Sequence, residues 1–503
     1  MMNSKDSEKF SKLNFILKEI VDIRRAQAIL IWDNNTHMPK FGAAMRGRQL
    51  ATLGKIAHEK FIHPEVGTLL RDLEKTESLL PYSSDEACLL RYVKIEYEKS
   101  TKLSPEFVSM MMEHQAVCYD KWIEAKAENN FKMIVPYLEK TLEHSLRYAE
   151  HFKYDHIADP LISESDYGFT AKSIQNIFVQ LRSELLPIVA DVLSRPSKEE
   201  SLFTNLSFPI ALQEKFVSMV AAEIGYDFNR GRIDQTPHPF MIAFSRNDVR
   251  ITTRFQENDI TDGLFSVIHE AGHALYELGI AENLDGTMLG EGTSSGVHES
   301  QSRLWENLVG RRFEFWEYFY PKLRSLFPEQ FSKISLNQFY AQINKVKKSL
   351  IRVDADELTY NLHVMIRFHL ELQMLEGKLK VKDLNEAWNA EYKKDLGLDV
   401  PSDSLGCLQD VHWYSSLIGG QFQGYTLGNI MSAQFYGAAN LKNSNLKNEI
   451  RQGNFSFLRL WLNENLHRHG KKYPGLEVLK MATGEDLTIA PYVNYLKGKF
   501  SKL

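Results

Sequence analysis

Residues 261–279 read TDGLFSVIHEAGHALYELG and are predicted to form one helix in a chain whose apolar residues mostly recur at helical spacing. Thr261 or Asp262 is suited to cap the first turn. Gly279 stands where a left-handed residue commonly ends a helix. The helix contains the pattern HExxH, formed by His269, Glu270 and His273.

Histidines four residues apart lie on one face of a helix, so the HExxH pattern allows both imidazoles to bind one zinc ion. Glu270 lies beside them, where it is placed to take a proton from the water that the zinc activates. The alternative is a helix whose two histidines only satisfy local hydrogen bonds. A catalytic zinc also needs a third protein ligand and an open coordination position.

A candidate for this third ligand follows the Gly-rich residues 286–296. Glu299 lies 26 residues after His273 and opens a predicted helix that continues through Leu304, Trp305 and Leu308. A carboxylate from a second helix completes a His, His, Glu ligand set. By composition alone, three other residues could be the third ligand: Glu277, Glu291 and His298.

A short sheet is predicted directly before the HExxH helix. Residues 249–255 alternate between apolar or Thr side chains and polar ones, which is the periodicity of a strand. They follow the apolar residues 240–244 through the turn-prone sequence SRND at residues 245–248. A small hairpin in a mostly helical protein is therefore expected at this point.

Composition excludes several classes of protein. The chain has 503 residues with 60 Lys and Arg against 65 Asp and Glu, a formal net charge of −5, so it lacks the basic surplus of a dedicated nucleic-acid binder. Hydrophobic residues make up 43% and charged residues 25%, which are values of a globular protein. The polar N-terminus lacks the apolar segment of a signal peptide, and no run is long enough to span a membrane, so we expect a cytoplasmic protein.

Three cysteines, Cys88, Cys118 and Cys407, are far apart, and none forms a CxxC pair. They exclude a disulfide framework and a thiolate zinc site, and we expect them to be small buried side chains.

The chain shows no internal repeat and no Gly/Ser linker. We expect one catalytic unit over residues 1–503, with an N-terminal helical part of about residues 1–200 and a site-bearing part of about 201–503, without a sharp boundary. Apolar stripes at helical spacing mark core faces: Leu13, Ile16, Leu17, Ile20 and Ile23, and then Leu212, Phe216, Val220 and Ile224 after Pro209.

The segment HEAGHALYELG followed by GEGTSSGVHESQSRLWENLVG resembles the carboxypeptidase Taq family of zinc metallocarboxypeptidases. Further family motifs occur in order over nearly the whole chain, at residues 32–49, 238–240, 248–252, 351–356 and 406–413. The resemblance implies that Glu299 is the third ligand. It also implies an essentially all-helical fold with a long central groove, and a homodimer.

The resemblance also implies roles for other residues. Arg352 and Arg250 are the candidates to bind the substrate's C-terminal carboxylate with a cationic fork, and His238 is a further candidate for substrate binding. His412 and Tyr425 are expected to donate to the oxyanion of the tetrahedral intermediate. Asp354, Asp356 and Asp410 are candidates to orient histidines or arginines. The chain departs from the family pattern at residues 165–170 and 418–425.

These observations predict a zinc-dependent carboxypeptidase that removes single residues from the free C-terminus of peptides, with cobalt or manganese as possible substitutes for zinc. The alternatives are an endopeptidase or dipeptidyl carboxypeptidase that uses the same zinc site, a non-catalytic peptide-binding protein with a structural zinc, and a helical scaffold without metal.

Overall fold

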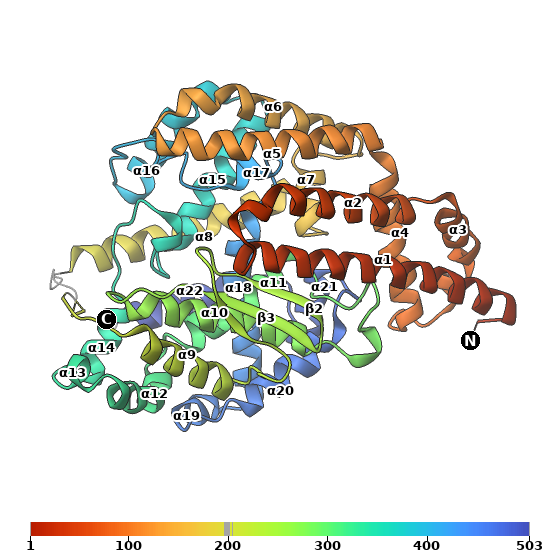
Figure 1. Cartoon of the computed structure of the whole chain (residues 1–503). Helices are drawn as coiled ribbons and strands as arrows, with labels where there is room; N and C mark the ends of the chain where they lie inside the picture. The colour runs from red at the N-terminus through yellow and green to blue at the C-terminus, as the bar shows by residue number, and fades with distance from the viewer. Residues whose placement is uncertain (1, 196–201, 204, 502–503) are drawn as a thin grey trace.

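The computed structural model describes residues 2–195, 202–203 and 205–501 and confirms a mostly helical fold with one small sheet (Figure 1). The two ends of the chain lie on opposite sides of the molecule (Figure 1). Buried apolar side chains form a cluster that extends from Leu13 near the N-terminus to Phe500 near the C-terminus.

The N-terminal third consists of helices that pack in sequential pairs, α1 with α2, α3 with α4 and α5 with α6. Leu13, Leu17 and Ile20 of the predicted stripe are buried against this packing, because residues three and four apart share one helix face. The helices are α1 (Ser4–Thr36), α2 (Ala43–Phe61), α3 (Pro64–Leu79), α4 (Asp85–Lys102), α5 (Pro105–Ala127) and α6 (Phe131–Glu150).

Three further helices lead to the sheet: α7 (Asp159–Ser165), α8 (Ala171–Ser194) and α9 (Ile210–Ile224). The sheet has the strand order β1-β3-β2. The predicted hairpin is confirmed, since β2 (Met241–Ser245) pairs antiparallel with β3 (Asp248–Thr253). Strand β1 (Ile233–Gln235) pairs parallel with β3 and was not predicted, because three residues are too few to show an alternating pattern.

Helix α10 (Ile260–Leu278) packs against the sheet and is the predicted HExxH helix, but both of its ends differ in detail from the prediction. The capping side chain is Asp259, which accepts a hydrogen bond from the Thr261 N–H at 2.8 Å. Gly279 has a right-handed φ of −86°, so the prediction of a left-handed residue was wrong. Glycine is needed there because a Cβ would lie 2.7 Å from the Cβ of His467.

The helix predicted to begin at Glu299 begins earlier and changes its winding. Ser294 caps α11 (Ser295–Arg303), which places Glu299 in the middle of this helix. The chain then continues as a π-helical turn, η3 (Leu304–Val309). Such turns widen a helix locally and are common at functional sites.

The C-terminal part wraps further helices around α10 and α11. Helix α18 packs along α11 and also contacts α15 and α22. These helices are α12 (Phe313–Leu326), α13 (Pro328–Phe331), α14 (Leu336–Ile343), α15 (Tyr360–Leu375), α16 (Leu384–Leu396), α17 (His412–Ser415), α18 (Gln423–Lys442), α19 (Leu446–Arg451), α20 (Ser456–Asn465), α21 (Gly475–Thr483) and α22 (Ala490–Phe500). Short 3₁₀ turns join several of them, among them η4 (Arg352–Asp354).

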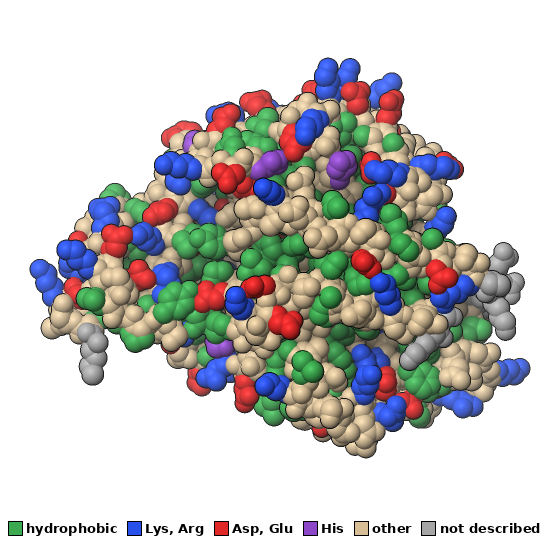
Figure 2. Space-filling view, turned by 180° about the vertical axis from the view of Figure 1, so that it is seen from behind, with side chains coloured by type: hydrophobic (Ala, Val, Ile, Leu, Met, Phe, Trp, Pro, Cys, Tyr) green, Lys and Arg blue, Asp and Glu red, His purple; other side chains and the backbone are tan. Residues whose placement is uncertain are grey.

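Two sequence predictions about the whole chain agree with the structure. Cys88, Cys118 and Cys407 are free and buried. On the face shown in Figure 2, basic and acidic side chains are interspersed, as expected for a nearly balanced charge. None of the helices in the described part of the chain combines the length and the hydrophobicity needed to cross a bilayer.

Candidate metal centre and active site

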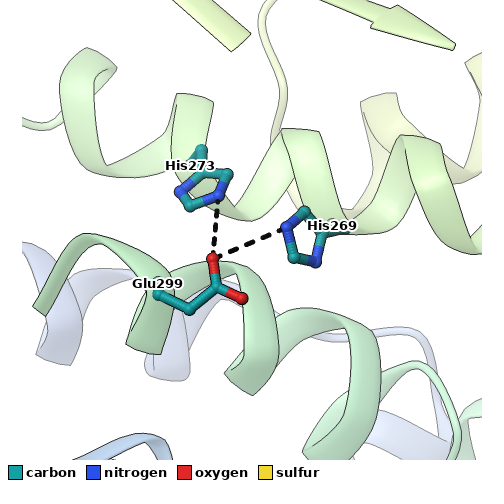
Figure 3. A group of neighbouring side chains, drawn as sticks. All are labelled: His269, His273 and Glu299. Carbon is teal, nitrogen blue, oxygen red and sulfur yellow. Dashed lines mark ion pairs between the residues drawn. The ribbon is translucent and has the colours of Figure 1, made fainter. Parts of the chain in front are cut away.

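His269, His273 and Glu299 come together between two helices, as Figure 3 shows. The histidines extend from α10 and the glutamate from α11. The Oε2 atom of Glu299 lies 3.4 Å from Nε2 of His273 and 3.8 Å from Nε2 of His269. All three potential ligand atoms lie within 4.8 Å of one another, a spacing that one metal ion can bridge with a small adjustment of the side chains.

The outer nitrogen of each imidazole is held by a hydrogen bond. Nδ1 of His269 lies 2.9 Å from the Glu306 carboxylate and donates to it. Nε2 of His298 donates to Glu277 at 3.0 Å, which leaves Nδ1 of His298 to accept from Nδ1 of His273 at 2.7 Å. In the neutral imidazoles both Nε2 atoms therefore carry their lone pairs towards Glu299, which is the tautomer that a metal ligand requires.

Glu299 is held by two residues of its own helix. Nε of Arg303 donates to its Oε1 at 2.6 Å, and the Ser302 hydroxyl donates to its Oε2 at 3.2 Å. Burial by itself would raise the pKa of Glu299, but Arg303 and His269 lower it well below its ordinary value. Glu299 is thus an ionised carboxylate beside two imidazoles. Together they form a donor set that fits a divalent metal such as zinc.

The three other candidates for the third ligand have different partners in the structure. Glu277 and His298 form the hydrogen-bonded pair behind His273. Glu291 forms ion pairs with Arg25 at 3.0 Å and Lys471 at 2.5 Å.

Glu270 is buried in the wall of the same cavity as the three ligands. Burial raises its pKa to about 7, against the opposing effect of His269. A carboxyl group with a pKa near neutrality is suited to accept a proton and to return it within one reaction cycle.

The cavity in front of this centre has a volume of about 1580 Å³ and extends from the sheet to η4 and α18. Of the residues predicted for the site, it is lined by the three ligands and by Glu270, His238, Arg352, Tyr425, Asp354 and Asp356. This cavity brings together residues between positions 203 and 425.

Arg352 is buried in the cavity wall and held from behind by Asp410. NH2 and Nε of Arg352 donate to Asp410 at 2.8 and 3.2 Å, and NH1 donates to the Tyr360 hydroxyl at 2.8 Å. Asp410 also binds Arg367 at 2.5 Å. Burial would raise the pKa of Asp410, but Arg367 and Arg352 lower it well below its ordinary value. The carboxylate thus fixes two guanidinium groups.

His412 lies behind Tyr425. The Tyr425 hydroxyl and Nε2 of His412 are 3.1 Å apart, and the Tyr425 ring lies 4.9 Å from the guanidinium carbon of Arg352. Burial and the nearby Arg352 lower the pKa of His412 to about 4, so the imidazole is neutral at neutral pH. Burial raises the pKa of Tyr425 well above its ordinary value, so Tyr425 keeps its hydroxyl proton.

The remaining predicted residues are more distant from the metal ligands or make other contacts. Arg250 pairs with Asp248 at 2.8 Å and lies over the Trp32 and Phe244 rings. Asp356 accepts hydrogen bonds from the N–H groups of residues 347, 358 and 359, which shapes the start of α15. Asp354 and His238 are exposed at the edge of the cavity.

Four residues of the site were not predicted from the sequence: Glu306, Arg303, Tyr360 and Arg367. Arg303 and Glu306 follow Glu299 by four and seven residues, a spacing that places side chains on one helix face. That spacing was the available signal for these two. Tyr360 and Arg367 reach the site only through the packing of α15, for which the local sequence carries no signal.

A family model described as carboxypeptidase Taq (M32) metallopeptidase matches residues 12–500. The chain belongs to this family. It is 36% identical to carboxypeptidase 1 of Bacillus subtilis over 499 residues, which is 97% of each chain. It is 34% identical to thermostable carboxypeptidase 1 of Thermus thermophilus over 486 residues, 95% of each chain.

This M32 metallocarboxypeptidase also has the fold of solved members. It is similar to the M32 carboxypeptidase of Deinococcus radiodurans with a TM-score of 0.95 and 44% identity, covering 98% of this chain and 99% of that one. The Trypanosoma cruzi metallocarboxypeptidase 1 is similar with a TM-score of 0.92 and 28% identity over the same shares of the two chains. The M32 family assignment and the cluster of His269, His273 and Glu299 agree that the enzyme has a metal site at this position.

Proposed function

We propose that this M32 carboxypeptidase releases single amino acids from the free C-terminus of peptides, with zinc held by His269, His273 and Glu299. The observation that carries the proposal is one cavity that contains a three-ligand metal site, a buried carboxyl group and a buried arginine. A bound zinc ion supplies Lewis acidity, which polarises a peptide carbonyl and lowers the pKa of water.

Glu270 acts as the general base. Its carboxylate takes a proton from the attacking water and delivers that proton to the nitrogen of the departing amino acid. Burial supports this role, because it raises the pKa of Glu270 and so makes its carboxylate a stronger base than an exposed one.

Arg352 binds the C-terminal carboxylate of the substrate. A guanidinium group recognises a carboxylate through paired hydrogen bonds and remains charged when buried. Asp410 and Tyr360 hold Arg352 in one orientation, so binding of the substrate does not have to order a free side chain.

Tyr425 donates a hydrogen bond to the oxygen that becomes negative as the peptide bond is attacked. Its hydroxyl keeps its proton because its pKa is raised, and the neutral His412 orients it from behind. Arg352 lies against the same ring, so substrate binding and oxyanion stabilisation use adjoining groups.

Mass spectrometry of a mixed peptide library tests the activity, with each peptide present as a free acid and as a C-terminal amide. We expect free acids to shorten one residue at a time, amides to remain intact, and a chelator to stop the reaction. Cleavage of amides at the same rate would show an endopeptidase, and loss of two residues per step a dipeptidyl carboxypeptidase. Either result would contradict the proposal.

We further propose zinc as the metal, a homodimer as the assembly and the cytoplasm as the location. The donor set supports zinc, and the family resemblance supports the dimer. Elemental analysis of the purified protein and light scattering coupled to gel filtration test the first two, and fractionation of the source cells tests the third. Cobalt or manganese in place of zinc, or a monomer at cellular concentration, would overturn these assignments.

A further inference from the structure

Asp166 is a fully buried carboxylate that joins three distant parts of the chain. It follows α7 directly, and its exposed fraction is 0%. Oδ1 accepts the backbone N–H of Gly296 at 2.7 Å. Oδ2 accepts the side-chain amide of Gln423 at 2.9 Å. Buried acidic groups are costly unless they are well hydrogen-bonded, so a group in this position needs a structural or functional reason.

The partners of Asp166 belong to the two helices that carry the site. Gly296 lies in the first turn of α11, three residues before the ligand Glu299, and Gln423 opens α18, two residues before Tyr425. The amide of Gln423 also donates to Ser165 at 2.9 Å and to the carbonyl of Gly420 at 3.0 Å. The two segments that depart from the family pattern in sequence, residues 165–170 and 418–425, therefore contact each other.

The two helices have no free space between them at this point. A Cβ on Gly424 would lie 2.5 Å from the Ser295 hydroxyl oxygen, and a Cβ on Gly428 would lie 2.6 Å from Cγ of Glu299. The backbone of α18 thus forms the surface against which the ligand side chain rests. A small shift of α11 along α18 would move the Glu299 carboxylate relative to His269 and His273.

We propose that Asp166 is a positioning residue of the metal centre, which fixes α11 on α18 and so sets the place of Glu299. Asp166 touches neither the metal ligands nor the cavity. It acts through the first turn of α11, and its loss should weaken metal binding more than it weakens the fold. This inference rests on the proposed ligand set.

Asparagine cannot replace Asp166 without conflict. In an Asp166→Asn variant one side-chain atom becomes an NH₂ group that faces the NH₂ group of Gln423 or the N–H of Gly296. Rotation of the Gln423 amide would relieve the first conflict but would turn its oxygen towards the carbonyl of Gly420. The first arrangement opposes two donors and the second opposes two acceptors, and both are unfavourable in a buried site.

Asp159, the first residue of α7, offers a control at the other end of this helix. Its half-buried carboxylate accepts two backbone N–H groups, those of Ala171 at 2.8 Å and His156 at 2.9 Å, but it touches neither α11 nor α18. Asp159→Asn should therefore lower thermal stability by a comparable mechanism without moving Glu299.

The experiment measures the affinity of the metal-free protein for Zn²⁺ by competition with a chromophoric chelator, together with the melting temperature without metal. We expect Asp166→Asn to weaken Zn²⁺ binding about tenfold or more, in the range typical of residues that orient metal ligands, and Asp159→Asn to leave it within twofold. Binding within twofold in Asp166→Asn, or equal weakening in both variants, would overturn the proposal. A Glu299→Ala variant that still binds Zn²⁺ like the parent would instead refute the ligand set.

A glycine pair in α18 keeps the test decisive if Asp166→Asn does not fold. Gly428→Ala introduces a methyl group against Glu299, whereas Gly437→Ala meets no atom within 4 Å in the same helix. Both changes improve helix propensity equally. We expect only Gly428→Ala to weaken Zn²⁺ binding, by tenfold or more. Equal affinities for the two variants would show that the contact of α11 with α18 does not set the ligand geometry.

Discussion

The role of Glu270 in proton transfer can be separated from metal binding, because Glu270 is not one of the three metal ligands. Glu270→Gln preserves the size of the side chain but removes the group that accepts a proton. We expect metal content equal to that of the parent and a fall of kcat/KM of about 100-fold or more, the usual contribution of a general base. Metal analysis and initial-rate kinetics on one peptide measure the two quantities.

The exposed Glu257, which lies before the same helix, supplies the control for this variant. Glu257→Gln makes the same chemical change outside the cavity and should retain activity. Turnover of Glu270→Gln at a rate near that of the parent would exclude Glu270 as the base.

Much of the site at the residue scale could be predicted, because local spacing carries it. His269, Glu270 and His273 are recognised by the HExxH pattern, whose two histidines lie four residues apart on one helix face. The family resemblance selected Glu299 from the four candidates for the third ligand. Tyr360 and Arg367 could not be assigned in this way, because their roles depend on distances across helix contacts. Proximity in the sequence can also mislead: Asp354 stands two residues from Arg352, yet its side chain is exposed.

At the scale of elements, the ligand helix α11 lies between α10 and α18 and meets both at glycines. On the α10 side, a Cβ on Gly272 would lie 2.6 Å from the carbonyl oxygen of Gln301 and 2.7 Å from Cα of Ser302. Both are backbone atoms, which cannot turn aside as the end of a side chain can. Gly272→Ala should therefore separate α10 from α11, and with them the two histidines from Glu299.

We expect Gly272→Ala to lower the melting temperature and to weaken metal binding, although alanine is the better helix former. Gly47→Ala in α2 meets no atom within 4 Å and should instead stabilise the protein, by up to about 1 kcal/mol. Thermal unfolding and Zn²⁺ titration of both variants make the comparison. A Gly272→Ala protein as stable as Gly47→Ala would show that α10 and α11 are not in fixed contact.

Element types were more predictable than element ends. The period of apolar residues identified α10 and the hairpin, because burial of one face imposes that period. Asp259 was missed as the cap because Thr261 and Asp262 are equally good cap formers in sequence. The π-helical turn after Arg303 has no local signature in the sequence.

At the scale of the whole molecule, we propose that the chain unfolds as one unit, as the continuous apolar cluster supports. Glu371 in α15 links this stability to pH. It is fully buried, it accepts a hydrogen bond from Trp413 at 2.8 Å, and burial raises its pKa to about 8. Since the folded-state pKa lies above the ordinary value near 4.5, the folded protein holds a proton that the unfolded chain has lost.

The contribution of Glu371 to stability is therefore complete below about pH 4.5 and is lost as the pH rises through 8. Glu371→Gln is neutral at every pH, so its unfolding free energy should fall less between pH 5.5 and 8.5 than that of the parent. With about 1.4 kcal/mol for each pKa unit, the difference should reach a few kcal/mol. Urea unfolding across this range measures it. The exposed Glu386→Gln serves as control, and parallel curves for parent and Glu371→Gln would contradict the assignment.

The hydrogen bond between Asp166 and Gln423 joins residues 257 positions apart, and this separation has a consequence during synthesis. A ribosome releases His269, His273 and Glu299 well before α18, the helix on which Glu299 rests, has left the exit tunnel. Until then a growing chain has all three ligands but lacks the surface that aligns them. We therefore expect Glu299 to be aligned with the two histidines only after α18 has been synthesised and has folded against α11.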